Sequence, residues 1–264
     1  MIEEPYRWVE AIANRREYIE HQLAGGSPIT ALSYEGGILL LTLSRERQKI
    51  FEIYDRIAMG GIGHPGDIER LRMAAIEVTS TEGFTRASQD VSLRRLANYS
   101  LSPVLKAAFE QIYGAPFLSR LLFAELSRGS GPNFFLRLDY DGSIRTNGGS
   151  FGRAFENFGV VSSTAASTAK MEEFLRANLP EKLNLEAALT LALDAWVVGH
   201  LTLGDDTAGS PTSAQVAKHR REQLDTASIE AAVLERDSAL PMTWRALPDS
   251  EIRPHLTAAT DSQM

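Results

Sequence analysis

The chain has 264 residues, a formal net charge of −7 and no cysteine. These features exclude disulfides, thiolate catalysis and cysteine-bound metals, and an acidic balance without a basic tract argues against nucleic acid as a partner. No apolar run is long enough to cross a membrane, and the N-terminus lacks a secretory apolar region, so we expect a cytoplasmic protein without membrane contacts.

The first expected element is an amphipathic helix over residues 6–23. Trp8, Ile12 and Ile19 recur at roughly helical spacing, and the opposite face is charged. The sequence Ala24-Gly25-Gly26 ends the helix, because glycine adopts the left-handed conformation of a helix C-terminus without strain. This pattern is typical of a helix that lies on another surface.

A cluster of four short strands follows, over residues 29–34, 38–43, 49–54 and 56–62. Apolar residues dominate these segments, and Gly36-Gly37 between the first two supplies the positive φ that a tight hairpin turn needs. The connections are too short for crossover helices. The cluster therefore predicts an antiparallel sheet.

The rest of the chain alternates helices and strands. Helices are expected from Asp67 to about residue 83 and from residue 88 or 90 to 113, the second being kinked or divided at Pro103. Strands are expected over 117–126, 133–140, 143–146, 158–162, 228–235 and 243–247. Further helices are expected over 165–178 and 185–198, with Ser163 or Thr164 and Asn184 as their N-terminal caps. Residues 203–225 are interpreted as a polar surface segment.

This order predicts an α+β fold in which two antiparallel sheets pack face to face and helices cover both outer sides. We interpret residues 1–247 as one domain, which includes the helix over residues 6–23. Residues 248–264 contain turn formers and little periodicity, and are expected to form a frayed C-terminal tail.

The strand cluster carries a resemblance to a known family. The turn Tyr34-Glu35-Gly36-Gly37, the apolar strand after it and the segment KIFEIYDRI from Lys49 to Ile57 resemble the start of a proteasome core-particle subunit. The chain is most similar to the bacterial α-type, and the resemblance continues to about Leu247. It implies the N-terminal-nucleophile hydrolase fold, a four-layer α-β-β-α sandwich, in agreement with the order of elements.

The resemblance implies a non-catalytic role. Subunits of this type form a homo-oligomeric outer ring on β-type proteasome subunits, narrow the entrance for substrates and receive an ATPase activator. Proteolysis by such a threonine-type endopeptidase complex belongs to the β-type partners. Lys49 stands where α-type subunits carry a lysine that pairs with the C-terminal carboxylate of a docked activator. The N-terminal helix is expected to bury Trp8, Ile12 and Ile19 partly against a neighbouring subunit.

An alternative is a self-compartmentalising peptidase that matures by cleavage between Gly26 and Ser27. Ser27 would then be the nucleophile and Lys49 would lower the pKa of its hydroxyl group. Pro28 restricts the backbone of Ser27, and Leu43 replaces the aspartate that catalytic subunits carry at the end of the second strand. A third possibility is a scaffold on this fold without β-type partners.

No cofactor or metal is expected. The five histidines, His21, His64, His200, His219 and His255, are scattered along the sequence without the spacing of metal ligands.

Overall fold

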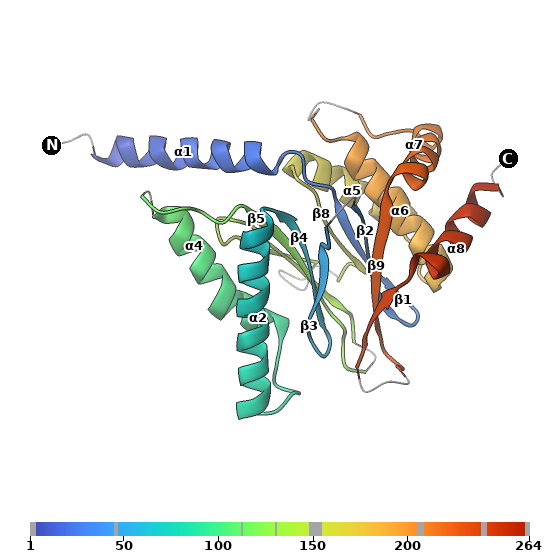
Figure 1. The fold of residues 1–264 in the computed structure, drawn as a ribbon, viewed down its shortest axis with the longest axis horizontal. Helices are drawn as coiled ribbons and strands as arrows, with labels where there is room; N and C mark the ends of the chain where they lie inside the picture. The colour runs from blue at the N-terminus through green and yellow to red at the C-terminus, as the bar shows by residue number, and fades with distance from the viewer. Residues whose placement is uncertain are drawn as a thin grey trace.

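A computed structural model describes residues 4–44, 47–111, 113–129, 131–147, 155–204, 209–238 and 242–261. Its centre consists of two five-stranded antiparallel sheets (Figure 1). The first sheet has the order β10-β9-β2-β1-β8 and contains β1 (Ile29–Tyr34), β2 (Gly37–Ser44), β8 (Phe158–Val161), β9 (Ser228–Glu235) and β10 (Trp244–Leu247). The second has the order β3-β4-β5-β6-β7 and contains β3 (Ile50–Tyr54), β4 (Ile57–Gly63), β5 (Ser119–Glu125), β6 (Phe134–Leu138) and β7 (Ile144–Thr146).

The two sheets pack face to face through apolar side chains. Alternation along β1 directs Ile29 and Ala31 toward the second sheet, and Leu32 toward the helices on the other side. The hairpin between β1 and β2 depends on Gly37, whose φ is +153°. A Cβ there would lie 1.9 Å from the carbonyl oxygen of Leu234 on β9, so only glycine permits this close approach.

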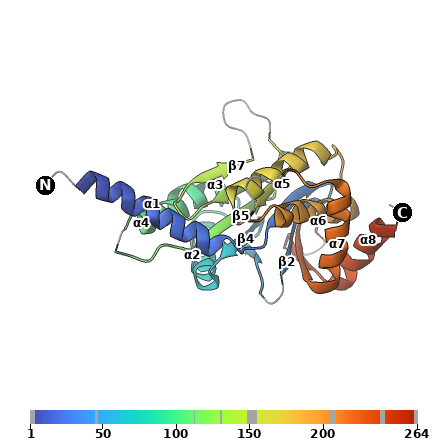
Figure 2. The ribbon, with the colours of Figure 1, turned by 90° about the horizontal axis from the view of Figure 1, so that it is seen from above.

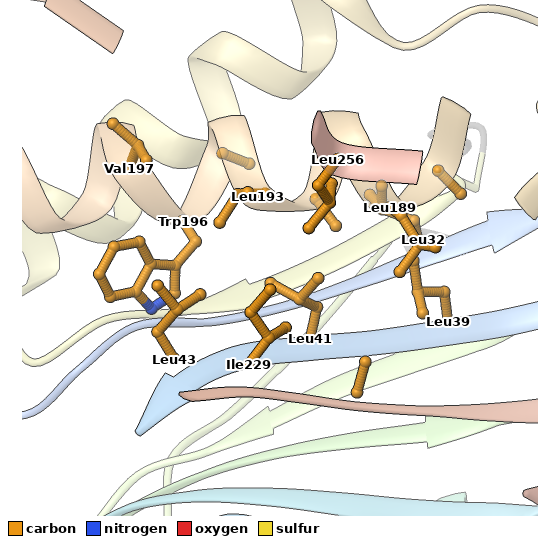
Figure 3. Close-up of a cluster of buried hydrophobic side chains, with 14 of the residues drawn as sticks. Leu32, Leu39, Leu41, Leu43, Leu189, Leu193, Trp196, Val197, Ile229 and Leu256 are labelled. Carbon is orange, nitrogen blue, oxygen red and sulfur yellow. The ribbon is translucent and has the colours of Figure 1, made fainter. Parts of the chain in front are cut away.

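Helices cover both outer faces, which confirms the predicted four-layer α-β-β-α sandwich. On the first sheet lie α5 (Ala165–Asn178), α6 (Leu185–Leu201) and α8 (Asp249–Asp261), and α7 (Ser213–Thr226) packs on α6. On the second lie α2 (Pro65–Thr85), α3 (Leu93–Arg95), a π-helical turn (Leu96–Leu101) and α4 (Ser102–Glu110). Figure 3 shows Leu193 and Trp196 of α6 above Leu41 and Ile229 of the first sheet.

The N-terminal helix α1 (Glu4–Leu23) projects from the sandwich, so its two ends have different surroundings (Figures 1 and 2). Ile19 and Leu23 are buried with Phe109 and Tyr140 of the same chain. The expectation that Ile19 packs on a neighbouring subunit is therefore wrong. Trp8, by contrast, is 46% exposed.

A buried cation fixes the inner end of α1. The Arg120 guanidinium on β5 contacts Glu20 of α1 at 2.5 Å and Asp139 at 3.1 Å, and also donates to the carbonyl oxygen of Ser163. The Tyr140 hydroxyl donates to the same Glu20 carboxylate at 2.7 Å. These contacts hold the C-terminal turns of α1 on the second sheet.

Two sequence predictions near the C-terminus are wrong. The supposed polar segment contains α7, which begins with a capping box formed by Thr212 and Gln215. The supposed frayed tail contains α8, whose Ile252 and Leu256 are buried in the core of the first sheet. The division of the chain into one domain and a tail stays a prediction.

The helix caps are partly as predicted. Thr164 and Asn184 each accept a hydrogen bond from the first turn of the following helix. Ser163 instead donates to the carbonyl oxygen of Ala24 at 2.9 Å, so it joins the end of α1 to the sandwich.

Among the described residues, no helix combines the length and apolar character needed to span a bilayer.

Candidate functional site

A pocket of about 920 Å³ lies where the segment between α1 and β1 crosses the ends of β2 and β3. We call it the Lys49 pocket. Its wall combines backbone from glycine-rich segments with apolar, aromatic and basic side chains. It is lined by Gly25, Gly26, Ser27, Leu43, Ser44, Arg47, Gln48, Lys49, Phe51, Gly61, Gly63, Pro65, Ile68, Glu69, Trp196, His200, Leu203, Gln223 and Ala227. Both site residues named from the sequence, Ser27 and Lys49, are therefore part of one cavity.

The Ser27 hydroxyl is held by hydrogen bonds on two sides. It donates to the carbonyl oxygen of Leu43 at 2.7 Å, and it accepts from the indole nitrogen of Trp196 at 3.0 Å. The next residue, Pro28, is buried, and its carbonyl oxygen accepts from the Thr42 hydroxyl at 2.6 Å. These contacts fasten the start of β1 to the end of β2.

Lys49 lies directly before β3, and its side chain reaches the segment that precedes β1. The ammonium donates to the carbonyl oxygen of Ser27 at 2.7 Å. Burial lowers the pKa of Lys49 to about 8, and the opposing charge of Glu230 offsets part of that effect. Because this pKa is close to neutral pH, a small rise in pH converts the ammonium of Lys49 into the neutral amine.

Glu230 fixes the backbone beside this lysine. Its Oε1 accepts from the backbone N–H groups of Lys49 at 3.0 Å and Ile50 at 2.8 Å, and its Oε2 accepts from Lys49 N–H at 2.9 Å. Burial raises the pKa of Glu230, while these N–H groups and the Lys49 charge lower it. The carboxylate thus joins β9 of the first sheet to the start of β3 in the second.

An aromatic stack forms the wall of the pocket on the side of α6 and α7. The ring of His200 lies 4.8 Å from that of Trp196 and 5.0 Å from that of His219. His200 Nδ1 and His219 Nε2 are 2.9 Å apart, within hydrogen-bonding distance. The fold thus brings together two histidines that stand far apart in the sequence. Within the described part of the chain, no group of three or more potential ligands could hold a metal ion.

Three residues of the site were missed by sequence reasoning, namely Trp196, His200 and Glu230. They stand about 150 to 200 positions from Ser27 and Lys49, and no local motif joins them. Glu230 alone left a signal, because a carboxylate interrupts the apolar run SIEAAVLE of β9. An acidic residue in such a strand requires a partner once it is buried.

The arrangement is suited to binding a carboxylate. An ammonium has three N–H donors, and among the described residues only Ser27 accepts a hydrogen bond from it, so its remaining donors are suited to a ligand in the pocket. A nucleophilic role would require cleavage before Ser27, because the free amine of Ser27 would then serve as the base. In the intact chain the Ser27 hydroxyl donates to the carbonyl oxygen of Leu43.

Comparison with known proteins finds similarity over most of the chain. It is 30% identical over 230 residues to a proteasome subunit alpha of Actinosynnema mirum, which covers 86% of this chain and 78% of that protein. It is also 30% identical over 229 residues to a proteasome subunit alpha of Parafrankia sp., covering 86% and 84%, and over 230 residues to one of Mycobacterium leprae, covering 86% and 77%. No protein-family model matches the chain.

Proposed function

Because the chain belongs to the α-type subunits of the bacterial proteasome, we propose that it forms the outer ring of a core particle, narrows the entry of substrates and receives an ATPase activator. In this proposal the ring stacks on β-type subunits in the cytoplasm, and the β-type subunits hydrolyse the peptide bonds. The observation that carries the docking role is the Lys49 ammonium, which lines a pocket of about 920 Å³ and donates to only one acceptor among the described residues.

The lining of the pocket supports the C-terminus of a protein as the ligand. Lys49 can pair with the terminal carboxylate, while Phe51, Ile68 and Trp196 provide apolar and aromatic surface for the residues before it. A site that stays wet gives such a pair about 1 kcal/mol, and an enclosed one gives several. Burial of Lys49 favours the larger contribution.

The surface of α1 supports assembly into a ring. Trp8, Val9 and Tyr18 are 46%, 67% and 53% exposed, so this helix presents large side chains to solvent in both its outer and its inner part. A second copy of the chain would cover them. The outer end of α1 projects away from the sandwich (Figure 1), whereas its inner end leads into Gly25 and Gly26, which line the Lys49 pocket.

The alternative of a peptidase with Ser27 as nucleophile has less support. It requires cleavage after Gly26 and a lysine that faces the serine hydroxyl, whereas Lys49 contacts the serine carbonyl oxygen. The Ser27 hydroxyl is also held by Leu43 and Trp196.

Activator stimulation of a Lys49→Ala variant tests the proposal. Hydrolysis of a fluorogenic peptide is measured in the complex with β-type subunits, with and without an ATPase activator. Stimulation is expected to be lost, while hydrolysis without the activator persists because the partner subunits perform it. Lys49→Arg keeps the charge with altered reach, and should restore stimulation in part. Loss of hydrolysis in the absence of the activator would instead favour the peptidase alternative.

A further inference from the structure

Glu230 is a buried acid that the proposed docking role does not by itself require. It comes from β9, at the far end of the sequence from β1 and β3, and touches the pocket through the backbone of Lys49. Three hydrogen bonds of 2.8 to 3.0 Å join its two oxygens to consecutive backbone N–H groups. Burial raises the pKa of Glu230, and the N–H donors and the Lys49 charge oppose that rise by favouring the ionised form.

We propose that Glu230 is the positioning residue of the Lys49 pocket: it fixes the first residue of β3 and its charge keeps the Lys49 ammonium in the protonated form that binds a carboxylate. This inference rests on the proposed docking function. It assigns to Glu230 two separable effects, one through hydrogen bonds to the backbone and one through electrostatics.

The electrostatic effect follows from the surroundings of Lys49. Burial disfavours the charged form of its amine, and Glu230 opposes this. Among the described residues, the other charged or titratable side chains that line the pocket are Arg47 from the preceding loop, Glu69 from α2 and His200 from α6. Glu69 is paired with Arg72 at 2.7 Å, and an arginine stays charged at all relevant pH values. Well above the pH at which a histidine ordinarily titrates, about 6.5, the amine of Lys49 is, among the described side chains of this wall, the group whose charge changes.

The direction of the pH dependence is set by the amine. A lysine that must be protonated to bind loses its ligand as the pH rises through its pKa, which is about 8 here. The carboxylate of a peptide stays ionised throughout this range. Without the Glu230 charge, the same loss occurs at lower pH.

The substitution Glu230→Gln separates the two effects. Oε1 accepts two of the three hydrogen bonds, and the amide oxygen of glutamine can take the same place. The variant therefore retains most of the backbone contacts and removes the charge. Asp225→Asn is a matched control, because it changes the net charge equally at an exposed position of α7.

The experiment measures binding of a tetramethylrhodamine-labelled peptide that ends in Leu-Tyr-Ala with a free carboxylate. Fluorescence anisotropy is recorded between pH 6.5 and 9.5 with the full chain in its native assembly. Wild-type protein and Asp225→Asn should lose binding around pH 8, and the midpoint for Glu230→Gln should move down by about one pH unit. Peptide binding by Lys49→Arg should not fall between pH 6.5 and 9.5, because arginine stays charged. The double variant Lys49→Arg/Glu230→Gln should behave in the same way.

A second measurement reports the Lys49 amine without any ligand. Acetic anhydride labelling, followed by mass spectrometry of the peptide that contains Lys49, gives the pH at which this amine becomes reactive. That pH should be lower in Glu230→Gln than in wild type. An unchanged labelling profile in a folded Glu230→Gln variant overturns the inference about Glu230. If Glu230→Gln lowers the labelling pH as expected but peptide binding does not depend on Lys49, the proposed docking function is overturned instead.

Discussion

The Lys49 ammonium donates its hydrogen bond to the carbonyl oxygen of Ser27, at 2.7 Å, while the hydroxyl of the same serine donates to Leu43. The lysine therefore positions the backbone just before β1. The serine side chain is held instead by Leu43 and Trp196 in the wall of the pocket. This relationship separates the binding of a carboxylate, which needs the ammonium, from nucleophilic chemistry, which needs an activated hydroxyl.

The first prediction concerns maturation. Because Ser27 is held by Leu43 and Trp196 and is followed by a buried proline, we expect the bond between Gly26 and Ser27 to stay intact. Intact mass spectrometry of the protein co-expressed with β-type subunits should give the full chain, with or without Met1. A species that begins at Ser27 would contradict the non-catalytic assignment.

The second prediction concerns the ligand's carboxylate. If this group pairs with Lys49, amidation of the activator's C-terminus should reduce stimulation as strongly as Lys49→Ala does. Combining the two changes should add little, because each removes the same interaction. Stimulation of peptide hydrolysis, measured for the four combinations, gives the coupling directly. Additive losses would show that the carboxylate binds elsewhere.

The third prediction distinguishes the two ends of α1. Trp8→Asp should impair ring formation, as measured by native mass spectrometry, without lowering the melting temperature of the subunit, because Trp8 is largely exposed. Ile19→Ala should lower the free energy of unfolding by about 2–5 kcal/mol, since it opens a cavity beside Phe109 and Tyr140. Normal rings in the Trp8→Asp variant would show that the outer part of α1 is not an interface.

The fourth prediction concerns α8. Ile252 and Leu256 are 0% and 1% exposed, and Figure 3 places Leu256 beside Leu189 and Leu193 of α6. Either alanine substitution should lower the free energy of unfolding by about 2–5 kcal/mol in urea denaturation. Ser250→Ala, at an exposed position of the same helix, should change it by less than about 0.5 kcal/mol. Equal effects of the three substitutions would refute a core role for α8.

The fifth prediction concerns the buried ion pair between α6 and α7. Arg220 is 2% exposed and donates to Asp194 at 2.9 Å. Burial raises the pKa of Asp194, and Arg220 lowers it. In Arg220→Met the pKa of the folded-state carboxyl group therefore rises further. The destabilisation, about 3 kcal/mol at neutral pH, should diminish as the pH falls and Asp194 becomes protonated. Denaturation at pH 5 and pH 7.5 checks this, and a cost independent of pH would contradict it.

Local patterns were sufficient to predict much of the fold. The range 165–178 coincides with α5 and the range 228–235 with β9, because apolar side chains recur along both and the cap Thr164 marks the start of the helix. The buried side chains of α7 are Val216, Arg220 and Leu224. The helix was missed because an arginine breaks this apolar pattern, and its burial depends on the ion pair with Asp194 of α6. Helix α8 was missed because Pro254 lies inside it.

The site was predictable only in part for the same reason. Ser27 and Lys49 were found because a family resemblance marks their positions. The hydrogen bonds that define their roles come from Leu43, Trp196 and Glu230. Which of these meet the pocket depends on the pairing of β2 with β9 and on the packing of α6, and no local spacing encodes either.

The order of strands in the two sheets bears on folding during synthesis. The second sheet follows chain order from β3 to β7, so each new strand finds its partner already made. In the first sheet, β2 pairs on its other side with β9, from Gly37 with Glu235 to Ser44 with Ser228. An edge of eight mostly buried residues therefore stays unpaired until nearly the whole chain has left the ribosome. Open strand edges promote aggregation. Chains of this protein that are truncated or stalled before β9 should therefore aggregate more readily than the full chain.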